Sequence, residues 1–455
     1  MAPQPSEWTK ISAANGFSQI STTGKKVKTK DCRLNGKFPV IDQGQDLIAG
    51  YVDDPDKLIN VSDSLIVFGD HTRAVKWLDF SFVPGADGTK ILQPASYLFP
   101  RFAYYQLRSL EIPNKGYSRH FKFLKELEFA VPPFAEQKVI ADKLDTLLAQ
   151  VENTKARLER IPQILRRFRQ SVLAAAVSGR LTEEWRSQNS LTPPSETWPG
   201  CEEITKCFDI PSDWAGVALG SVSERVSVGH VGKTSEFYTD EGSGIPFLRS
   251  QNVRPGRISL DGLAHITEHF HQSLRKSQLQ PGDLLIVRVG ANRGDACVLP
   301  SIFPQVNCAN IVFARPKQGL SPYLNLYFQS PLSQELLLGT TVGGAQGVIN
   351  TKSVAQTFLA LPPVEEQSEI VHQVDELFAC ADRIEQQVNN ALARVNNLTQ
   401  SILAKAFRGE LSERWRKDNP ELISGENSAK ALLERIKAER ASMKPANKNR
   451  KRTPA

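Results

Sequence analysis

The most constraining feature of this chain is a stretch of about 60 residues that occurs twice. The second copy follows the first by 230 positions (362 − 132) without an insertion. Val131-Pro132-Pro133 with Glu136-Gln137 returns as Leu361-Pro362-Pro363 with Glu366-Gln367, and residues 179–185 return as residues 409–415. Self-similarity at a fixed offset indicates an internal duplication. The chain is therefore expected to contain one structural frame twice.

Apolar residues in each copy are spaced as in a long helix that needs a partner. They recur in alternating steps of four and three, which places a narrow apolar seam along the helix. A single such helix could equally lie on the core of its own domain. Because two matched seams occur, and neither is flanked by enough apolar sequence to cover it, we expect the two helices to pair. The seam residues are Ile140, Leu144, Leu147, Val151, Thr154, Leu158, Ile161, Leu165, Phe168 and Val172 in the first copy, and Ile370, Val374, Leu377, Ala381, Ile384, Val388, Ala391, Val395, Leu398 and Ile402 in the second.

Pro162 departs from this pattern, since the second copy has Leu392 at the matching position. Proline lacks the amide hydrogen and its ring collides with the preceding turn. We therefore expect the first helix to kink or break after its middle.

The segments that precede the two helices, called heads below, also begin alike. Pro5-Ser6-Glu7-Trp8 returns as Pro211-Ser212-Asp213-Trp214, 206 positions later (214 − 8), so the second head is 24 residues longer (230 − 206). Short apolar runs bounded by Gly, Asp and Pro predict β-rich heads. Residues 64–68 and 283–287 are candidate equivalent strands, as are 38–41 and 245–248, and residues 323–338 predict a helix interrupted at Pro331.

The order along the chain is thus head, helix, head, helix, which is an α+β organisation. Residues 428–440 predict a short helix with Ser428 as its N-cap. Lys444, Lys448, Arg450, Lys451 and Arg452 follow without an acid. Such a tail is usually disordered, with a sequence-independent phosphate contact as the alternative. The predicted domains are 1–130, 131–186, a linker at 187–211 rich in residues that end helices, 212–360, 361–419 and 420–455.

Composition excludes several classes of protein. The N-terminal residues lack the basic and apolar regions of a signal peptide, and no run approaches 18 apolar residues, so a cytoplasmic protein is expected. The 6 cysteines show no C-x-x-C pair, which disfavours a zinc site or a disulfide framework. A net charge of +7 makes a polyanion a plausible partner.

Two motifs resemble enzyme signatures but fail in detail. Residues 229–234 lack the first glycine of a phosphate-binding loop, because Ser227 stands there, and no apolar strand precedes them. Val131-Pro132-Pro133-Phe134 lacks the polar first residue of the amino-methyltransferase motif, so the prolines are expected to end a strand and start a helix. With no other catalytic pattern, the chain is predicted to be non-catalytic.

The heads do carry side chains of the kinds that contact DNA. Arg and Lys suit guanine edges and phosphates, whereas Asn and Gln suit adenine. For any one residue a solvated surface position is the simpler interpretation, but their occurrence in loops of both heads favours DNA. The candidates are Lys25, Lys26, Lys28, Lys30, Arg33, Arg119 and Lys122 in the first head, and Arg249, Gln251, Asn252, Arg254, Arg288, Asn292, Arg293, Gln346 and Lys352 in the second.

Long runs in the helical and C-terminal regions resemble the specificity subunits of type I restriction-modification systems, in particular the K-type (type IA) family. These runs are residues 141–151, 161–165, 387–411 and 422–427. The heads are covered less well, as expected if relatives recognise different targets.

The resemblance implies a non-enzymatic subunit with two target-recognition domains, each reading half of a split DNA site. It implies that the helices form an antiparallel coiled coil with pseudo-twofold symmetry that docks two methylation subunits. Those partners would bind S-adenosylmethionine and methylate adenine at N6, and two ATP- and Mg-dependent restriction subunits would complete the complex. No cofactor or metal is expected in this chain itself. The alternatives are a free-standing two-headed DNA-binding regulator and, less favoured, a self-sufficient enzyme.

Overall fold

The computed structural model describes residues 5–86, 88–113, 116, 118–194, 209–317, 319–339 and 347–442. The chain divides into two compact units. Unit 1 comprises Met1–Glu159 with Asn390–Ala455, and unit 2 comprises Arg160–Asn389. Each unit therefore contains one head together with part of both long helices.

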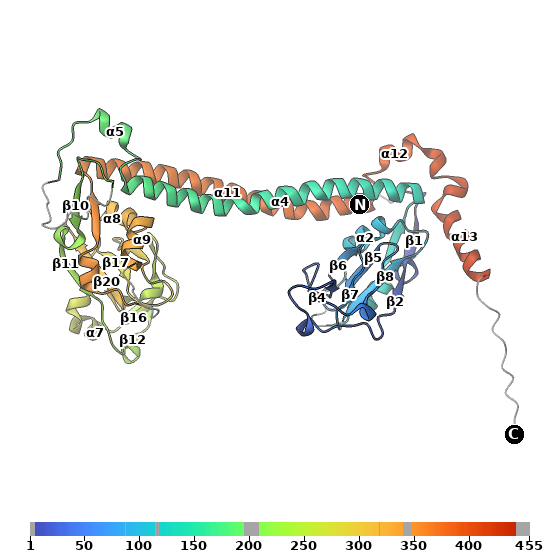
Figure 1. Cartoon of the computed structure of the whole chain (residues 1–455), viewed down its shortest axis with the longest axis horizontal. Helices are drawn as coiled ribbons and strands as arrows, with labels where there is room; N and C mark the ends of the chain where they lie inside the picture. Colours follow the sequence, from blue (N-terminus) through green and yellow to red (C-terminus); the bar gives the residue numbers. More distant parts are fainter. Residues whose placement is uncertain are drawn as a thin grey trace, which may run out of the picture. The chain divides into compact units, whose positions relative to one another are not determined.

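The head of unit 1 contains a four-stranded and a three-stranded sheet (Figure 1). The larger has the order β2 (Phe17–Ile20), β8 (Thr89–Pro94), β5 (Leu65–Gly69), β6 (Val75–Leu78), and the smaller β4 (Gly50–Val52), β3 (Phe38–Ile41), β7 (Val83–Pro84). β1 (Thr9–Ser12) pairs antiparallel with β9 (Glu128–Val131), so the first and last strands of the head lie side by side. The helices are α1 (Ala13–Gly16), α2 (Pro100–Ser109) and α3 (Phe121–Glu126).

Strand β5 is buried on both faces, which explains its continuous apolar sequence. Ile66 and Phe68 belong to the core that faces α2, whereas Leu65 and Val67 belong to a separate core on the opposite face. Successive side chains of a strand point to opposite faces, so an uninterrupted apolar run fits a strand covered on both sides.

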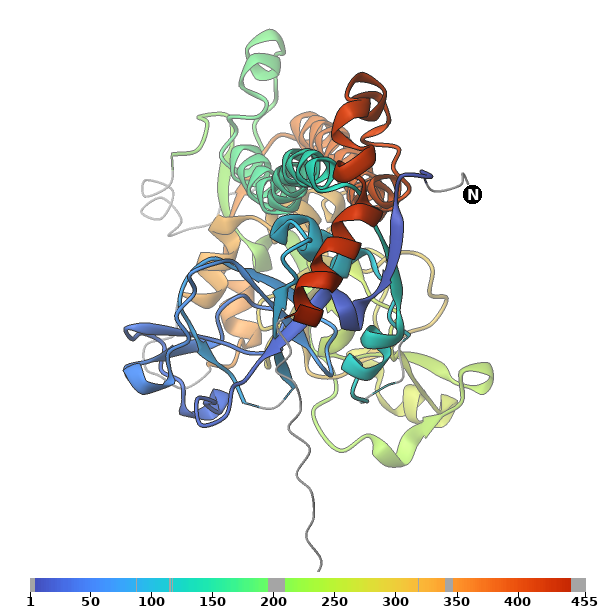
Figure 2. The ribbon, with the colours of Figure 1, turned by 90° about the vertical axis from the view of Figure 1, so that its right-hand side faces the viewer.

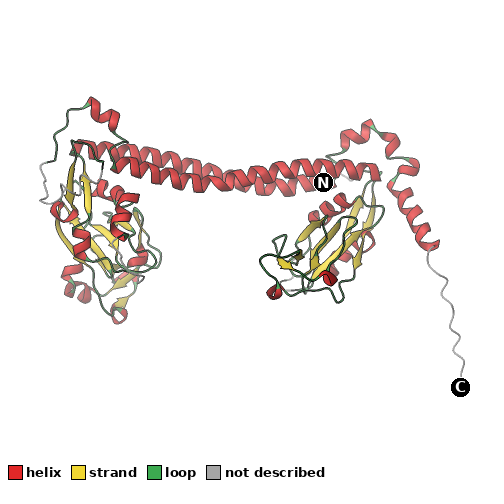
Figure 3. Cartoon of the chain, viewed as in Figure 1, coloured by secondary structure: helices red, strands yellow, loops and turns green. Residues whose placement is uncertain are grey.

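The head of unit 2 has the same arrangement of two sheets, with one further strand, β12, in the smaller sheet; Figure 3 shows the strands of both heads in yellow. Its sheets have the orders β11 (Ser223–Val228), β20 (Ile311–Pro316), β17 (Leu284–Val287), β18 (Ala296–Val298), and β12 (Tyr238–Thr239), β16 (Ala264–Ile266), β13 (Ile245–Leu248), β19 (Asn307–Cys308). The predicted equivalences are confirmed, because β5 and β17 occupy the same place, and both β3 and β13 pair in parallel with a short strand. β14 (Val253–Arg254) and β15 (Arg257–Ile258) form a hairpin, and β10 (Ala215–Ala218) pairs with β21 (Phe358–Leu361).

The helices of this head are α7 (Glu268–Ser273), α8 (Ser321–Tyr327), α9 (Pro331–Leu338) and α10 (Thr351–Ala355). The interruption predicted at Pro331 is present, since α9 begins there. The Ser330 hydroxyl caps α9 by accepting a hydrogen bond from the Ser333 amide at 3.3 Å.

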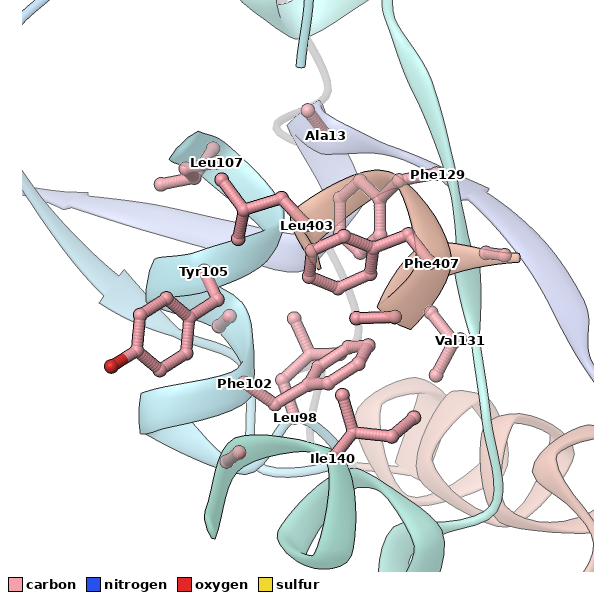
Figure 4. Close-up of a cluster of buried hydrophobic side chains, with 14 of the residues drawn as sticks. Ala13, Leu98, Phe102, Tyr105, Leu107, Phe129, Val131, Ile140, Leu403 and Phe407 are labelled. Carbon is pink, nitrogen blue, oxygen red and sulfur yellow. The ribbon is translucent and has the colours of Figure 1, made fainter. Parts of the chain in front are cut away.

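The repeated stretches form α4 (Phe134–Val177) and α11 (Val364–Phe407), each of 44 residues. Both follow a strand that ends at the Pro-Pro pair, as the sequence predicted. In each unit the two helices run antiparallel. In unit 1, Leu403 and Phe407 of α11 enter the head core beside Phe102 of α2 and Ile140 of α4 (Figure 4). In unit 2, Arg169 of α4 contacts Glu385 of α11 at 3.1 Å.

The predicted seam consists of two rows of residues along each helix, which we call columns, with a seven-residue spacing within each column. The structure agrees with one column and differs from the other. Leu144, Val151, Leu165 and Val172 are buried, as are Ile140, Ile370, Val374, Val388 and Ile402. Phe168, Ile384 and Leu398 are exposed instead. Leu147, Leu158, Ile161, Leu377 and Val395 are only partly buried.

The second column lies one residue further along than predicted. In α4 it passes through Leu148, Lys155, Arg169 and Ala176. Spacing alone does not distinguish the predicted column, through Leu147, from the observed column, through Leu148. Both positions are leucine, and the observed column continues through polar residues. The drift of a 3.6-residue helix against a seven-residue repeat makes such a slip easy.

The helix α4 is not broken at Pro162, which lies inside it. The predicted break is therefore wrong, and the predicted kink stays a prediction. A proline removes one hydrogen bond of a long helix and costs about 3 kcal/mol. Packing along the rest of α4 offsets that cost.

The C-terminal helix α13 (Ala429–Ser442), drawn in red in Figure 2, belongs to unit 1. The Ser428 hydroxyl accepts from the Ala431 amide at 3.2 Å and so caps the helix, as predicted. Leu433 and Ile436 of α13 are buried in the core of unit 1. The basic residues from Lys444 to Arg452 lie outside the described part of the chain.

Among the described helices, none combines the length and hydropathy needed to cross a membrane. Cys32, Cys297, Cys308 and Cys380 are free thiols. Burial raises the pKa of Cys297 to about 12, which keeps it protonated.

Candidate functional site

A buried glutamate joins each head to the helices of its unit. Glu136 and Glu366 are the matching residues in the first turns of α4 and α11, and neither is exposed to solvent. We call the two clusters the unit 1 joint (Trp8, Glu136, Gly409, Ser412, Arg416) and the unit 2 joint (Thr182, Gly179, Arg186, Trp214, Glu366).

In the unit 1 joint, Glu136 receives hydrogen bonds from three side chains that belong to two segments remote from each other in the sequence. The Trp8 indole nitrogen donates to Oε2 at 2.9 Å, and the Ser412 hydroxyl donates to Oε1 at 2.6 Å. The Arg416 guanidinium forms an ion pair with Oε1 and also donates to the Gly409 carbonyl at 2.8 Å. A buried carboxylate is tolerated only when it is paired and hydrogen-bonded in this way.

The unit 2 joint repeats these contacts. Glu366 accepts from the Trp214 indole at 2.8 Å and from the Thr182 hydroxyl at 2.7 Å. Arg186 pairs with Glu366 and donates to the Gly179 carbonyl at 2.9 Å. Each arginine also lies over the indole of its joint, about 6 Å from the ring centroid.

A glycine is required in each joint. Gly179 and Gly409 have φ angles of +74° and +79°, a region that favours glycine. A Cβ at Gly179 would lie 2.3 Å from Pro211, and one at Gly409 would lie 2.6 Å from Pro5. The Pro-x-x-Trp and Gly-x-x-[ST] markers of the duplication are therefore the two sides of one packing contact.

The joints fix where each head meets its helices. Trp8 precedes β1, Glu136 follows β9, and these strands are paired, so the joint clamps both ends of the head. Arg416 comes from α12 (Glu413–Asp418), at the end of the second repeat. Sequence analysis found Trp8, Glu136 and the segment 409–415 as repeat markers but missed Arg416 and the contact among them.

The candidate DNA-binding residues of the first head fall into two groups. Lys26, Lys28 and Lys30 are exposed and line one surface hollow, together with Lys57. The nearby Lys25 donates to the Leu58 carbonyl at 2.6 Å, and Arg33 pairs with Asp53 at 3.0 Å. Arg119 and Lys122 are exposed near the start of α3, outside that hollow.

In the second head the structure brings several candidates together at the end of β17. Arg288, Asn292 and Arg293 lie in the loop between β17 and β18, and Arg293 donates to the Gly347 carbonyl at 2.5 Å. The β14–β15 hairpin packs beside this loop, since the Gly256 amide donates to the Ala296 carbonyl at 2.9 Å. Burial raises the pKa of Asp295 in the loop, and the positive charge of Arg254 opposes that shift.

The other candidates of the second head lie elsewhere. Arg249 and Gln251 both donate to the Gly262 carbonyl, at 2.8 and 3.2 Å, and Arg249 lies over the Tyr238 ring. Lys352 is exposed in α10. Gln346 lies outside the described residues.

Asn252 is a correction to the predicted set. Its side chain is completely buried and holds its own loop together. Its Oδ1 accepts from the Arg249 amide, and its Nδ2 donates to the Ser259 carbonyl, both at 3.0 Å. An amide with these partners cannot also reach a base, and sequence alone does not distinguish such an asparagine from a surface one.

One arginine was missed by sequence analysis. Arg73 lies in the turn between β5 and β6, the counterpart of the loop that holds Arg293, and has a φ angle of +62°. It donates to the Ile112 carbonyl at 3.1 Å, beyond α2. The corresponding contact of Arg293 is to Gly347, beyond α9.

Across the described residues, no group of three or more His, Cys, Asp or Glu side chains could hold a metal ion. Two features of the site recur in both units. They are the joints and the loop arginines Arg73 and Arg293.

Comparison with known proteins assigns the chain to a family. The family model described as "Type I restriction modification DNA specificity domain" matches residues 5–163 and 211–394. The specificity subunit of the type I restriction enzyme EcoBI of Escherichia coli is 44% identical over 339 residues, 72% of this chain and 68% of that protein. The EcoKI specificity subunit of Escherichia coli strain K12 is 40% identical over 381 residues, 80% of this chain and 76% of that protein.

Solved structures share the fold. A chain from work on the assembly and conformational transition of a type I R-M system has a TM-score of 0.58 at 18% identity, covering 90% of this chain and 99% of the other. The HsdS subunit of Thermoanaerobacter tengcongensis has a TM-score of 0.50 at 18% identity, covering 90% of this chain and all of the other. These comparisons favour the specificity-subunit interpretation over a free-standing regulator. Since the family model matches more than half of its length, the chain belongs to the family of type I restriction-modification DNA specificity subunits.

Proposed function

We propose that each head reads one half of a bipartite DNA site on behalf of a type I restriction-modification complex. The duplicated joint carries this proposal, because it attaches two heads of one topology to their helices through the same set of contacts. Two heads that are each attached through the same buried contacts suit recognition of two half-sites.

In the first head we propose that the hollow lined by Lys26, Lys28 and Lys30 contacts phosphates, since these ammonium groups are exposed. In the second head we propose that DNA is contacted by the loop of Arg288 and Arg293, together with the adjoining hairpin of Arg254 and Arg257. The Nε of Arg288 is buried without a protein partner. Arginine forks suit guanine and phosphate, so this loop is the stronger candidate for base contacts.

The helix pair is proposed to dock two methylation subunits. These partners would supply S-adenosylmethionine and the N6-adenine methylation step, and restriction subunits with ATP and Mg²⁺ would join through them. The chain itself would be a non-catalytic recognition subunit acting in the cytoplasm. The pseudo-twofold frame supports two docking sites, since a duplicated chain offers each of two identical partners a related surface.

A head exchange tests this function. Residues 1–128 of the chain are replaced by the head of a relative, the chimera is coexpressed with its partners, and the methylated adenines are mapped by sequencing. We expect one half of the recognised site to change and the other to stay. A change in both halves, or in neither, would contradict the proposal.

Size measurement after coexpression provides a second test. The chain should copurify with methylation subunits in a complex larger than the chain alone. A chain that stays alone yet binds DNA with sequence preference would instead indicate a regulator, and methyl transfer by the isolated chain would indicate an enzyme.

A further inference from the structure

One motif of the sequence takes no part in the proposed function. Residues 229–234 resemble a phosphate-binding loop but lack its first glycine. In the structure they follow β11 directly, and Lys233 within them is exposed. A lysine on an exposed loop is by itself an ordinary surface feature. The role of Lys233 therefore depends on where the fold places this loop.

The backbone places the loop where the first head has its lysines. Val27 forms a parallel bridge with Gly85, and His230 forms a parallel bridge with Ala309. The amides of Val27 and His230 donate to the carbonyls of the last residues of β7 and β19, at 3.0 and 2.8 Å. β7 and β19 are equivalent strands, because each pairs in parallel with β3 or β13. Val27 and His230 therefore occupy the same position in the two heads.

The residues that follow can be matched one by one. Three positions further on, Lys30 corresponds to Lys233, and both are exposed. Lys26 and Lys28 have no basic counterpart, since the matching residues are glycine and valine. Of the three lysines proposed to contact phosphates in the first head, Lys30 is thus the one whose charge both heads keep.

The loop leaves the larger sheet at the same end as the arginine loop. β11 and β17 both pair antiparallel with β20, so they run in the same direction on either side of it. Val228 pairs with Val312 and Val287 with Ile311, so β11 and β17 both end beside the start of β20. Neighbouring strands lie about 4.8 Å apart, and the two loops therefore begin about 10 Å apart. In the first head, β2 and β5 lie on either side of β8 in the same way.

This spacing fits a DNA duplex. The major groove is about 12 Å wide, and phosphates border it on both sides. A loop that contacts phosphates can therefore lie beside a loop that enters the groove, as the loop of Arg288 and Arg293 is proposed to do. Phosphate contacts position a protein on the duplex, whereas base contacts select the sequence.

Contacts within the second head hold the loop and place a further charge beside it. The Thr234 hydroxyl lies 2.8 Å from the Tyr238 hydroxyl, and the Arg249 guanidinium lies over the Tyr238 ring, 5.8 Å from its centroid. Tyr238 is 39% exposed, so this edge of the loop faces solvent. In the part of the chain that the structure describes, no carboxylate forms an ion pair with Lys233 or Arg249. Their positive charge is therefore available to a ligand.

We propose that Lys233 contacts a DNA phosphate in the second head, at the place that Lys30 has in the first. Each head then uses two neighbouring loops for different tasks. The loop after β2 or β11 holds the DNA backbone, and the loop after β5 or β17 reaches the bases. In the first head the base-reading loop is the turn that carries the exposed Arg73. This inference rests on the proposed function and deepens it by giving both heads the same division of tasks.

A matched pair of substitutions, Lys233→Gln and Lys317→Gln, tests this contact. Each removes one exposed charge from the second head, but Lys317 lies at the opposite end of β20, where its amide donates to the Val222 carbonyl at 2.9 Å. The full chain is coexpressed with its methylation subunits. Fluorescence anisotropy over a salt series then measures the affinity for a labelled duplex that carries the methylated site and for one that lacks it.

Lys233→Gln should lower the magnitude of the slope of log affinity against log salt by about 0.9, the value for one phosphate contact. It should weaken binding to both duplexes by the same factor, because a phosphate contact carries no sequence information. Lys317→Gln should leave slope and affinity unchanged. Neither variant should change the melting temperature, which separates a lost contact from a lost fold.

The first head provides a second comparison. Lys30→Gln should lower the magnitude of the slope by the same amount as Lys233→Gln. The double variant should lower it by about 1.8, since the two lysines belong to separate heads and their effects add.

Three outcomes would overturn the inference. They are an unchanged slope for Lys233→Gln, an equal change for Lys317→Gln, and a change in the preferred bases in place of a uniform loss of affinity. A loss in Lys233→Gln without one in Lys30→Gln would refute the equivalence of the two loops. If the unaltered complex did not prefer the duplex that carries the site, the proposed function would be contradicted instead, so the two failures are distinguishable.

Discussion

The two joints agree contact for contact, whereas the helix surfaces beside them have diverged. Glu136 and Glu366 receive the same three kinds of donor, at distances that differ by about 0.1 Å for the indole and hydroxyl contacts. By contrast, Arg169 pairs with Asp382 and Glu385 in unit 2, while the matching residues of unit 1 are Thr399, Glu152 and Lys155. A buried charge network tolerates little change, because each lost partner leaves another group unsatisfied. Exposed positions are free to acquire separate roles.

The loops that follow β3 and β13 also differ between the two heads, because different side chains hold them. In the first head the ammonium of Lys76 holds this loop, donating to the carbonyls of Asp42 and Asp46 at 2.8 and 2.5 Å. In the second head the buried amide of Asn252 has that task. The two heads thus share their strands and differ in how they hold their loops.

The largest expected effect comes from the joints. Glu136→Gln and Glu366→Gln should each destabilise their own unit by about 3–5 kcal/mol, because a buried arginine loses its ion partner. Hydrogen exchange should show lost protection of β1 and β9 for the first variant, and of β10 and β21 for the second. Clearly unequal losses, or loss of protection in the other unit, would break the equivalence of the joints.

The register of the seam predicts the next largest effect. In unit 1, Leu148→Ala should cost about 2–5 kcal/mol of unfolding free energy, and Leu147→Ala clearly less, since only Leu148 is fully buried. In unit 2 the matching residues Leu377 and Phe378 are both partly buried, so their alanine variants should cost similar amounts. Urea unfolding measures all four. A larger cost for Leu147→Ala than for Leu148→Ala would restore the register predicted from the sequence.

Asn252→Ala should destabilise the second head by about 1–3 kcal/mol, because it leaves buried backbone groups without partners. The neighbouring Gln251 is exposed, so Gln251→Ala should change stability by less than about 0.5 kcal/mol. Thermal unfolding of both variants checks the distinction. If Asn252→Ala weakened DNA binding without a change in stability, the buried role of Asn252 would be refuted.

The ion pairs of Arg169 predict a smaller difference between the units. Arg169→Met should cost up to about 1 kcal/mol, since Asp382 and Glu385 are largely exposed and solvent screens the attraction. The matching substitution in unit 1, Thr399→Val, should have almost no effect. The cost of Arg169→Met should shrink in high salt, and a cost that did not depend on salt would point to packing instead.

The smallest effect is the pH dependence that Lys76 contributes to the first head. Burial lowers the pKa of Lys76, so the unfolded chain binds more protons than the folded one as the ordinary lysine pKa, about 10.4, is approached from below. The contribution of Lys76 to the stability of the first head should therefore rise slightly with pH in that range, whereas the raised pKa of Tyr105, caused by burial, acts in the opposite direction. The difference in stability between the unaltered chain and Lys76→Met should shift in favour of the unaltered chain as the pH rises, as measured by hydrogen exchange of β5 and β6. A difference that did not change with pH would exclude Lys76 as a source of pH dependence.

Much of the fold could be predicted from the sequence, because the duplication and its spacing are local patterns. The strands after residues 64 and 283, the helices after both Pro-Pro pairs and the Ser428 cap all follow from short-range rules. The second column of the seam could not be placed, because Leu147 fits the predicted register and Leu148 the observed one. Lys155 and Arg169 also belong to the observed column, and an apolar pattern does not include such residues.

The joints lay beyond prediction for a different reason. Trp8 and Arg416 are remote in sequence, and no spacing rule brings an indole and a guanidinium to one carboxylate. Likewise, Asn252 and Gln251 are adjacent polar residues of similar type, and only the folded loop decides which of them is buried.

The unit 1 joint also has a consequence for how the protein is made. Its tryptophan is residue 8, but its arginine is residue 416, so the two are synthesised far apart in time. The unit 2 joint needs nothing beyond Glu366. During translation, the joint of the head that is synthesised second can close first, while the joint of the earlier head stays open until Arg416 has been synthesised.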